Sequence, residues 1–157
     1  MSQVNLSKKY ITLICRNAIK EDLNPSGDIT SNLLKKDNIK RLKMVSNQRG
    51  ILGGLDFAKE TFRLVDKKIN IKILKKEGSL IKKGSIIAIV EGDLKKILVA
   101  ERVALNFISL ISGIASYTNK FVRKVGKKTK ICCTRKTIPT IRKIQKYAVK
   151  LGGGYNH

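Results

Sequence analysis

The sequence is short of acidic residues. It has 11 Asp and Glu against 34 Lys and Arg, which gives a formal net charge of +23. A basic excess of this size indicates anionic partners, such as nucleic acid, phosphorylated metabolites or an acidic membrane face. The alternative interpretation is a solvated surface shaped by biased base composition, because 26 of the cations are lysines and they are scattered along the chain.

Aromatic residues are also scarce, at 5% of the chain, and tryptophan is absent. A nucleic-acid-binding module of this charge would be expected to cluster its cations with exposed aromatic rings or to carry a recognition helix. No such signature is present, so nucleic acid is not the partner that we expect. A steep salt dependence of binding to arbitrary oligonucleotides would favour that alternative.

Cysteine is rare, with three residues of which two are adjacent. This spacing excludes a disulfide framework and matches no metal-binding pattern. Cys132 and Cys133 lie in a short apolar run, where neighbouring side chains point to opposite sides of a strand. Buried thiols in a reducing compartment are the expected state.

Long apolar runs and a secretion signal are not apparent either. No stretch is expected to span a membrane, and residues 1–6 are polar rather than signal-like. We therefore expect a cytoplasmic protein without a membrane partner. Apolar residues make up 42% of the chain, which is enough for a core and argues against disorder.

Hydrophobic periodicity predicts alternating helices and strands. Ser7 or Asn5 is expected to cap the first helix, residues 21–30 form a turn-rich loop, and Gly113 is expected to break or bend the longest helical segment. The predicted elements are a helix at 5–20, a strand at 39–45, a helix at 55–65, strands at 69–73 and 86–90, and helical residues at 94–125.

The middle of the chain is β-rich and punctuated by glycines, and it resembles the hammerhead or lipoyl-carrier type of module. A carrier needs a modifiable lysine at an exposed hairpin tip. Lys82 and Lys83 lie instead between Gly78 and Gly84, so we interpret the pattern as shared architecture. A lipoyl or biotinyl adduct on either lysine would favour a carrier.

The last quarter of the chain carries the candidate chemistry. An apolar run, Ile131–Cys133, stops at the cationic tetrad Thr134–Thr137; Pro139 and a helical pattern follow, and then the glycines at 152–154. Pro near a helix start and Gly past its end are the usual punctuation. In α/β sheets and barrels the reactive groups sit at the carboxyl ends of strands, which is where Thr134–Lys136 are expected.

Arg102 lies in a mostly apolar helical segment and therefore needs a partner. One interpretation is an internal ion pair, with Glu101 or with an acidic residue elsewhere in the chain. The other is that Arg102 projects towards an anionic ligand or across a subunit boundary. The sequence leaves both open.

Three motifs together resemble the quinolinate phosphoribosyltransferase family, and the resemblance covers essentially the whole chain. One is helical, Ala100–Phe107 followed by Leu110–Ser116. The second joins Thr134-Arg135-Lys136-Thr137-x-Pro139 and Lys146–Val149 to Gly152-Gly153-Gly154-x-Asn156-His157. The third is Glu21–Leu23 with Gly27–Thr30.

The resemblance implies an enzyme of de novo NAD synthesis. Such an enzyme transfers phosphoribose from 5-phosphoribosyl-1-pyrophosphate to quinolinate and releases nicotinate mononucleotide, pyrophosphate and carbon dioxide, with Mg²⁺ required. It implies that Arg135 and Lys136 are catalytic and bind quinolinate, with Thr134 beside them and His157 at the next strand end. It also implies a homodimer or hexamer in which Arg102 enters the neighbouring site.

The fold implied by the resemblance is of the α+β class. A hammerhead-like α/β sandwich at 1–113 is followed at 114–157 by the first part of an incomplete α/β barrel. The family pattern continues beyond Asn156-His157, and the metal ligands are expected there, so none is expected here. We expect a fragment that lacks phosphoribosyltransferase activity by itself, which an assay of quinolinate-dependent pyrophosphate release would test.

Two departures from the family pattern are visible. Cys133 stands where an acidic or small residue is common, and Thr140 stands where Gly is usual, which puts the turn after Pro139 in doubt. Alternatives within the same fold are a molybdenum-transport homologue and nicotinate phosphoribosyltransferase. The second alternative does not decarboxylate, and the tetrad Thr134–Thr137 together with Gly152–His157 argues against it.

Overall fold

The computed structural model describes residues 5–24, 38–126 and 128–157. The predicted loop motif Gly27–Thr30 lies outside these residues. The elements in chain order are α1 (Lys8–Leu23), β1 (Ile39–Val45), β2 (Gly50–Ile51), α2 (Leu55–Val65), β3 (Asn70–Ile73), β4 (Leu80–Ile81), β5 (Ile86–Asp93), α3 (Leu94–Val125) and α4 (Arg142–Leu151). This mixture of helices and antiparallel strands is the predicted α+β class.

Helix α1 begins one turn later than the predicted range and ends three residues beyond it. Ser7 is the cap, since its hydroxyl accepts a hydrogen bond from the Tyr10 amide at 3.3 Å. The side chain satisfies an amide that has no partner within the helix. The buried face of α1 contains Ile11 and Cys15.

The main sheet has three antiparallel strands in the order β1-β5-β3, and β2 pairs separately with β4. Val90 on the central strand lies opposite Leu42 on β1 and Ile71 on β3, which sets the register of the face that is buried. Asn70–Ile73 alternate between exposed and half-buried residues as predicted. One face of this sheet therefore points to a core.

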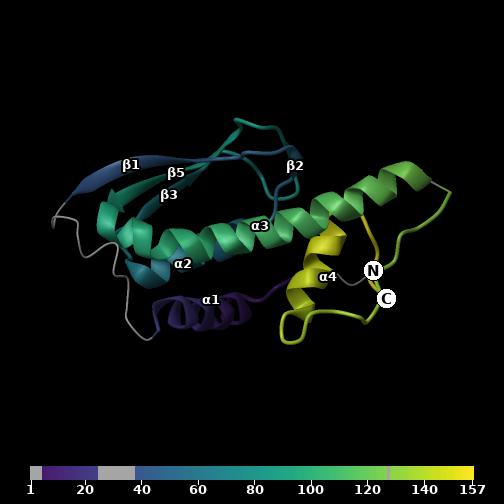
Figure 1. Ribbon diagram of the computed structural model, residues 1–157, viewed down its shortest axis with the longest axis horizontal. Helices are drawn as coiled ribbons and strands as arrows, with labels where there is room; N and C mark the ends of the chain where they lie inside the picture. Colours follow the sequence, from purple (N-terminus) through teal and green to yellow (C-terminus); the bar gives the residue numbers. More distant parts are fainter. Residues whose placement is uncertain (1–4, 25–37, 127) are drawn as a thin grey trace.

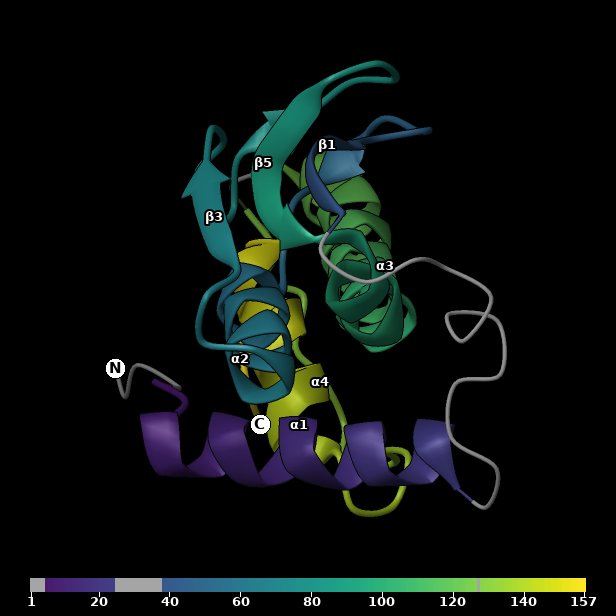
Figure 2. The ribbon, with the colours of Figure 1, turned by 90° about the vertical axis from the view of Figure 1, so that its left-hand side faces the viewer.

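That face is covered by α2 and α3. Figures 1 and 2 show the sheet on one side of these two helices and α1 on the other. Phe62, Leu52 and Ala100 lie in the core between sheet and helices, each almost completely buried. The sequence produces this layer because the apolar positions of α2 and α3 recur at helical spacing.

A second core joins α1, α2, α3 and α4. Phe57 and Phe107 stack at its centre with ring centroids 4.9 Å apart. Ile144 and Ala148 of α4 are completely buried in the same cluster, so α4 rests on the amino-terminal helices.

Glu60 is a buried charge in this layer, with 7% of its surface exposed. Its carboxylate accepts hydrogen bonds from the Arg63 guanidinium at 2.6 and 2.7 Å and from the Thr12 hydroxyl at 2.5 Å. The hydrogen bonds from Arg63 are the main reason that the pKa of Glu60 falls to about 2. Paired in this way, the carboxylate ties α1 to α2 without an unsatisfied charge.

Helix α3 corrects two predictions. Gly113 does not break it, because one continuous helix runs over Leu94–Val125; the packed residues on either side, Ile111 and Ala115, are completely buried and hold it together. By length and composition α3 is also apolar enough to cross a membrane, contrary to prediction. Its buried side packs on the sheet and on α2. Helices buried in a protein core can have the same length and apolar composition as membrane-spanning helices.

The cysteines differ from the expected buried state. All three are free; Cys15 is buried, Cys133 is half-buried and Cys132 is exposed. The prediction failed for Cys132 because, among the described residues, its segment pairs only with the segment that contains Tyr155, which leaves the Cys132 side chain uncovered.

Candidate functional site

The two halves of the carboxyl-terminal motif lie side by side. The Tyr155 amide donates to the Ile131 carbonyl at 2.8 Å, and the Cys133 amide donates to the Tyr155 carbonyl at 2.9 Å. These bonds form a parallel bridge between Cys132 and Tyr155. Both segments therefore end at the same edge, which brings Thr134 and Asn156 together as neighbours.

Glycines allow this pair of segments to press against α3. A Cβ atom on Gly152 would overlap the Ala115 carbonyl and lie 2.8 Å from the Cβ of Thr118, and a Cβ on Gly154 would lie 2.8 Å from a Thr118 methyl. The side-chain amide of Asn119 also donates to the Gly152 carbonyl at 3.2 Å. Only glycine fits this approach, which explains the glycine run in the motif.

The cationic tetrad forms an exposed loop directly after the first of these segments. The Lys136 amide donates to the Thr134 hydroxyl oxygen at 3.1 Å, and the Arg142 guanidinium donates to the Thr137 hydroxyl at 3.1 Å. Within the described residues, the charged groups of Arg135 and Lys136 have no ion pair. Both cations are therefore available to an anion.

The end of this loop is strained at one position. Thr140 has φ +70°, a left-handed conformation that Gly adopts easily and a threonine does not. The Ile138 amide is nevertheless satisfied, since it donates to the side chain of Gln145 at 2.8 Å. Thr140 stands where the family usually has Gly, and the turn after Pro139 is therefore formed at the cost of backbone strain at this threonine.

Cys133 connects both segments to α4. Its thiol donates to the Asn156 side-chain oxygen at 3.4 Å, and the Lys146 ammonium donates to the Cys133 sulfur at 3.5 Å. The Asn156 side-chain nitrogen is buried without a partner among the described residues. Lys146 therefore brings another cation to the edge where Asn156 and His157 end.

Arg142 and Lys146 were not among the predicted site residues, although Lys146 lies within the motif that carries the family resemblance. They are four residues apart, so they project from the same side of α4. The sequence signal that could have identified them is the position of two cations four residues apart, on the helix that follows the tetrad. Together with Arg135 and Lys136 they surround the loop with positive charge, while His157 is exposed at the end of the second segment.

Tyr147 fixes α4 to the rest of the molecule. Its hydroxyl donates to the Glu77 carboxylate at 2.8 Å. That carboxylate also accepts from the amides of Gly54 at 2.6 Å and Leu55 at 3.0 Å, and so caps α2, whose own N-cap residue has no side chain. Burial, and then the charge of Glu77, raise the pKa of Tyr147, which remains a donor.

Arg102 is not brought to this edge within one chain. It forms an ion pair with Asp22 at 3.1 Å, and its side chain is 64% exposed. Along α3 it lies about 20 Å from Ala115, at a rise of 1.5 Å per residue. The structure thus contains the internal ion pair that was one of the two interpretations, with Asp22 as partner instead of Glu101.

The described residues offer no ready metal site, because no group of three His, Cys, Asp or Glu side chains gathers among them. The Mg²⁺ ion that the family resemblance implies therefore does not fit the described residues.

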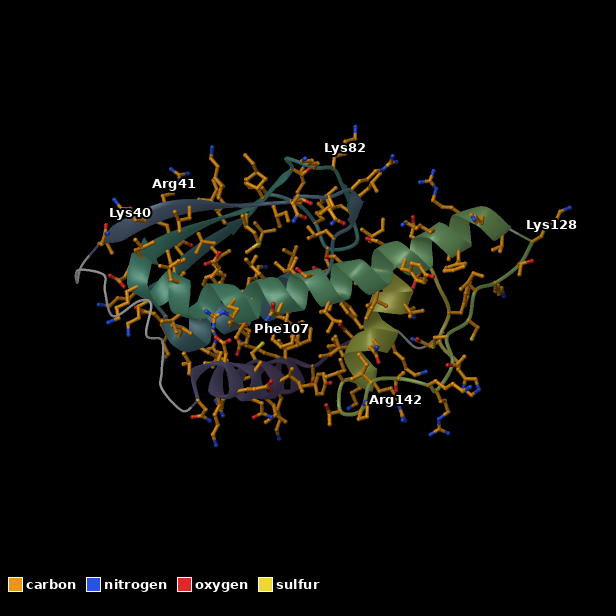
Figure 3. The ribbon with its side chains drawn as sticks, in the orientation of Figure 1. Lys40, Arg41, Lys82, Phe107, Lys128 and Arg142 are labelled. Atoms are coloured by element: carbon orange, nitrogen blue, oxygen red, sulfur yellow. The ribbon has the colours of Figure 1, made fainter. Side chains whose placement is uncertain are left out.

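The structure gives little support to a carrier module or a nucleic-acid-binding module. Lys82 lies in the turn between β4 and β5, where its amide donates to the Ser85 hydroxyl at 3.0 Å. Figure 3 shows labelled cations on separate parts of the molecule, with Lys40 and Arg41 on β1, Lys128 beyond α3 and Arg142 on α4. This spread is typical of a solvated basic surface.

Comparison with known proteins agrees with the family resemblance predicted from the three sequence motifs. The N-terminal domain of quinolinate phosphoribosyl transferase matches residues 28–112, and the C-terminal domain of the same family matches residues 114–157. The probable carboxylating nicotinate-nucleotide pyrophosphorylase of Bacillus subtilis is 41% identical over 138 residues, which is 87% of this chain and 47% of that protein. The chain spans about half the length of the curated relatives it matches.

Solved structures give the same result. The nicotinate-nucleotide pyrophosphorylase of Francisella tularensis superposes on 100% of this chain with a TM-score of 0.94 and 38% identity, and 56% of that chain is covered. NadC from Streptococcus pyogenes superposes on 98% of this chain with a TM-score of 0.92 and 33% identity, with 55% of that chain covered. The chain belongs to the quinolinate phosphoribosyl transferase family.

Proposed function

We propose that this chain is part of an enzyme that transfers phosphoribose from 5-phosphoribosyl-1-pyrophosphate to quinolinate. The products are nicotinate mononucleotide, pyrophosphate and carbon dioxide, and the relatives' names support this reaction. The observation that carries the proposal is the parallel bridge between Cys132 and Tyr155. It gives one common edge to the unpaired cations at 135 and 136 and to His157.

Arg135 and Lys136 are proposed to hold the substrate. Quinolinate has two carboxylates, and the planar fork of Arg135 suits a carboxylate while Lys136 provides a point charge. Loss of carbon dioxide leaves negative charge on the ring, which fixed cations stabilise. Thr134 and His157, at the two segment ends, are proposed to contact the same ligand and to orient it.

The remaining features of the enzyme are part of the same proposal. Residues 1–113 form the sandwich domain and residues 114–157 begin the α/β barrel. The working unit is a homodimer or hexamer in the cytoplasm, with Arg102 entering the neighbouring site. The Mg²⁺ that the family resemblance implies would be bound with 5-phosphoribosyl-1-pyrophosphate by ligands outside the described residues.

Calorimetric titration of the 157-residue chain with quinolinate tests the proposal. We expect Arg135→Met and Lys136→Met each to weaken binding by about tenfold to a hundredfold, the usual effect of losing a hydrogen bond to a charged group. Lys40→Met removes the same charge from exposed β1 and should leave the affinity unchanged. Nicotinate, with one carboxylate, should bind more weakly than quinolinate.

Equal weakening by Lys40→Met and Lys136→Met would mean that quinolinate responds only to overall charge, and the proposed site would be wrong. The same conclusion would follow if quinolinate and nicotinate bound equally well.

A further inference from the structure

The loop that carries Arg135 and Lys136 depends on one helix for its position. Inside the loop the hydrogen bonds are local: the Lys136 amide donates to the Thr134 hydroxyl oxygen at 3.1 Å, and the Thr137 hydroxyl donates to the Arg135 carbonyl at 3.5 Å. Such bonds shape a turn without fixing where it lies. The hydrogen bonds that tie this loop to another element, within the described part of the chain, are made with α4.

The two hydrogen bonds to α4 act on different parts of the loop. The Arg142 guanidinium donates to the Thr137 hydroxyl at 3.1 Å, and a hydroxyl can move with its side chain while the backbone shifts. The Ile138 amide donates to the side-chain oxygen of Gln145 at 2.8 Å, and an amide is part of the backbone itself. Gln145 therefore fixes the path of the main chain directly after the tetrad.

Gln145 lies on a rigid part of α4. Ile144, directly before it, and Ala148, one turn further on, are completely buried in the helical core. The hydroxyl of Tyr147 also donates to the Glu77 carboxylate at 2.8 Å, which links α4 to the start of α2. A side chain can position a loop only when its own backbone is fixed by packing and hydrogen bonds. Gln145 meets this condition.

The loop requires such support because its exit is strained. Thr140 has φ +70°, a conformation that a threonine avoids. A strained residue persists only where the surrounding contacts hold it. Ile138 precedes Thr140 and Gln145 follows it, so the hydrogen bond between them spans the strained position. Without that bond the backbone is free to relax at Thr140, and the cations that precede it in the loop would move.

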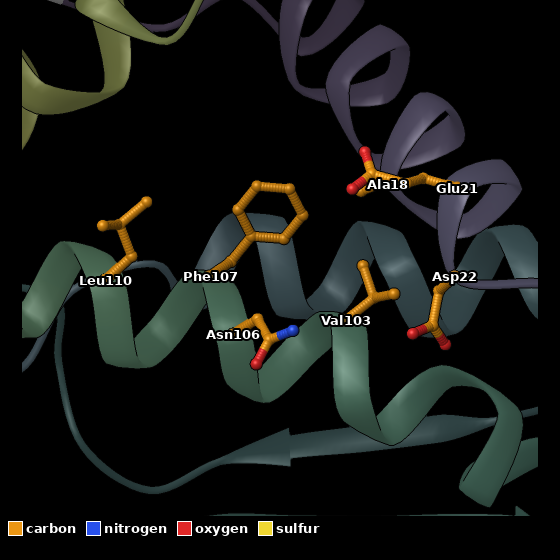
Figure 4. A pocket seen from close by; sticks show the side chains of 7 residues that line it. All are labelled: Ala18, Glu21, Asp22, Val103, Asn106, Phe107 and Leu110. Carbon is orange, nitrogen blue, oxygen red and sulfur yellow. The ribbon is translucent and has the colours of Figure 1, made fainter. Parts of the chain in front are cut away.

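The pocket between α1 and α3 is not suited to a dicarboxylate (Figure 4). Its volume is about 430 Å³, and its lining contains the carboxylates of Glu21 and Asp22 and no Lys or Arg. Like charges repel an anion from such a place. In the proposed function, selectivity for two carboxylates therefore depends on how Arg135 and Lys136 are arranged on their exposed loop.

We propose that Gln145 is the positioning residue that determines selectivity for a dicarboxylate at this site. By holding the Ile138 amide, it fixes the loop so that the Arg135 guanidinium and the Lys136 ammonium each contact one carboxylate of the same ring. This inference rests on the proposed function, because it concerns how quinolinate is distinguished from a pyridine with one carboxylate. Gln145 acts through the backbone of the loop and not through the substrate.

Calorimetric titration of the 157-residue chain with quinolinate and with nicotinate tests the inference. The quantity to compare is the ratio of the two dissociation constants, because partial unfolding weakens both ligands by the same factor. We expect the wild-type chain to prefer quinolinate and Gln145→Leu to lower that preference by about tenfold, the effect of misplacing one charged contact. Gln48→Leu makes the same chemical change at an exposed residue before β2 and should leave the ratio unchanged.

Gln145→Glu separates the hydrogen bond from the packing of the side chain. It keeps an acceptor oxygen at the same reach, and physiological salt reduces the effect of the added charge. Amide exchange at Ile138, followed by NMR, should rise by about tenfold in Gln145→Leu and stay at the wild-type rate in Gln145→Glu. The preference for quinolinate should follow the exchange rate, so that the first variant loses it and the second keeps it.

A Gln145→Leu chain that kept the wild-type ratio would overturn the inference and leave the proposed function intact. So would a Gln145→Glu chain that lost the preference although exchange at Ile138 stayed slow, since the hydrogen bond would then not be the cause. A wild-type chain that bound quinolinate and nicotinate equally well would instead contradict the proposed function, and with it the inference that rests on it.

Discussion

Two parts of the molecule pack against α3 but are stabilised differently. One is the sheet region, which contains β1–β5; the other is the carboxyl-terminal segment pair, the two segments that the bridge between Cys132 and Tyr155 joins. The sheet pairs β5 with β1 and β3 along extended ladders and buries one face in a core. The segment pair has one bridge, between Cys132 and Tyr155, and is positioned by glycine contacts with α3 and by α4. The candidate chemistry therefore lies on two segments joined by a single bridge, where the contacts of individual side chains with α3 and α4 matter most.

The largest effect is expected where the segment pair meets α3. Gly152→Ala pushes a methyl group into the Ala115 carbonyl, which is backbone and does not move easily, whereas Gly53→Ala in the sheet region meets a methyl of Ile111 at 2.6 Å. We expect Gly152→Ala to lower the free energy of unfolding by about 3 kcal/mol and Gly53→Ala by about 2 kcal/mol, since the methyl of completely buried Ile111 can shift only a little. Urea denaturation measures both.

Hydrogen exchange should then show that the loss from Gly152→Ala is concentrated in residues 131–157. Equal losses in the two variants, spread evenly over the chain, would contradict the contrast between the two regions.

The buried carboxylate of Glu60 gives a second test of the difference between the two regions, since it stabilises only the contact between helices α1 and α2. Glu60→Gln should lower the free energy of unfolding at neutral pH by about 2 kcal/mol, because it loses charged hydrogen bonds to Arg63. The pKa of Glu60 falls from 4.5 to about 2 on folding. Its stabilisation is therefore complete above about pH 5 and is lost as the pH falls towards 2.

Denaturation of wild type and Glu60→Gln over this range should give curves that converge as the pH falls. Glu91→Gln, at an exposed residue of β5, controls for the loss of one charge. A difference between wild type and Glu60→Gln that stayed constant from pH 7 to the acid limit would argue against this account.

The hydrogen bond between Tyr147 and Glu77 links the two regions. Tyr147→Phe should lower the free energy of unfolding by about 1 kcal/mol, because Glu77 keeps its two backbone donors. Tyr155→Phe should change it by less than about 0.5 kcal/mol, since that ring is 38% exposed. Thermal unfolding compares the two, and a larger effect at 155 would refute the assignment.

The smallest effect has the opposite sign. Thr140→Gly relieves a φ of +70°, and after the added flexibility of glycine is subtracted we expect a gain of about 0.5 kcal/mol. Thr129→Gly, at a residue without positive φ, should give no gain. A loss of stability in Thr140→Gly would show that the loop is not strained at this position.

The sequence predicts the three strands of the main sheet, but it misses the short pair β2 and β4, and β5 runs to Asp93 instead of ending at residue 90. Residues 55–65 form α2 as expected, and the strand at 39–45 is found with the same ends, because apolar periodicity and local caps determine these elements. The failures concern tertiary context. Gly113 was expected to interrupt α3, yet packing on both sides maintains the helix, and the exposure of Cys132 depends on which segments pair.

The site could be predicted in part. The motif containing Thr134–Lys136 and His157 predicts where the cationic edge lies, because reactive groups in α/β folds sit at the carboxyl ends of strands, on the loops that lead into helices. Arg142 was not recognised, and Lys146 was noted only as part of the motif, since the role of both depends on how α4 is oriented against the two segments joined by Cys132 and Tyr155. Arg102 was left open between an internal ion pair and a role at an anionic ligand or a subunit boundary, and no local pattern in the sequence points to Asp22 as its partner.

The central claim is that the edge formed by the two parallel segments grips a dicarboxylate. A crystal structure of the chain with quinolinate tests it most directly. The account predicts that one carboxylate lies within hydrogen-bonding distance of the Arg135 guanidinium, that the other contacts the Lys136 ammonium, and that His157 lies beside the ring. Quinolinate bound elsewhere on the basic surface, with Arg135 and Lys136 turned to solvent, would contradict the account.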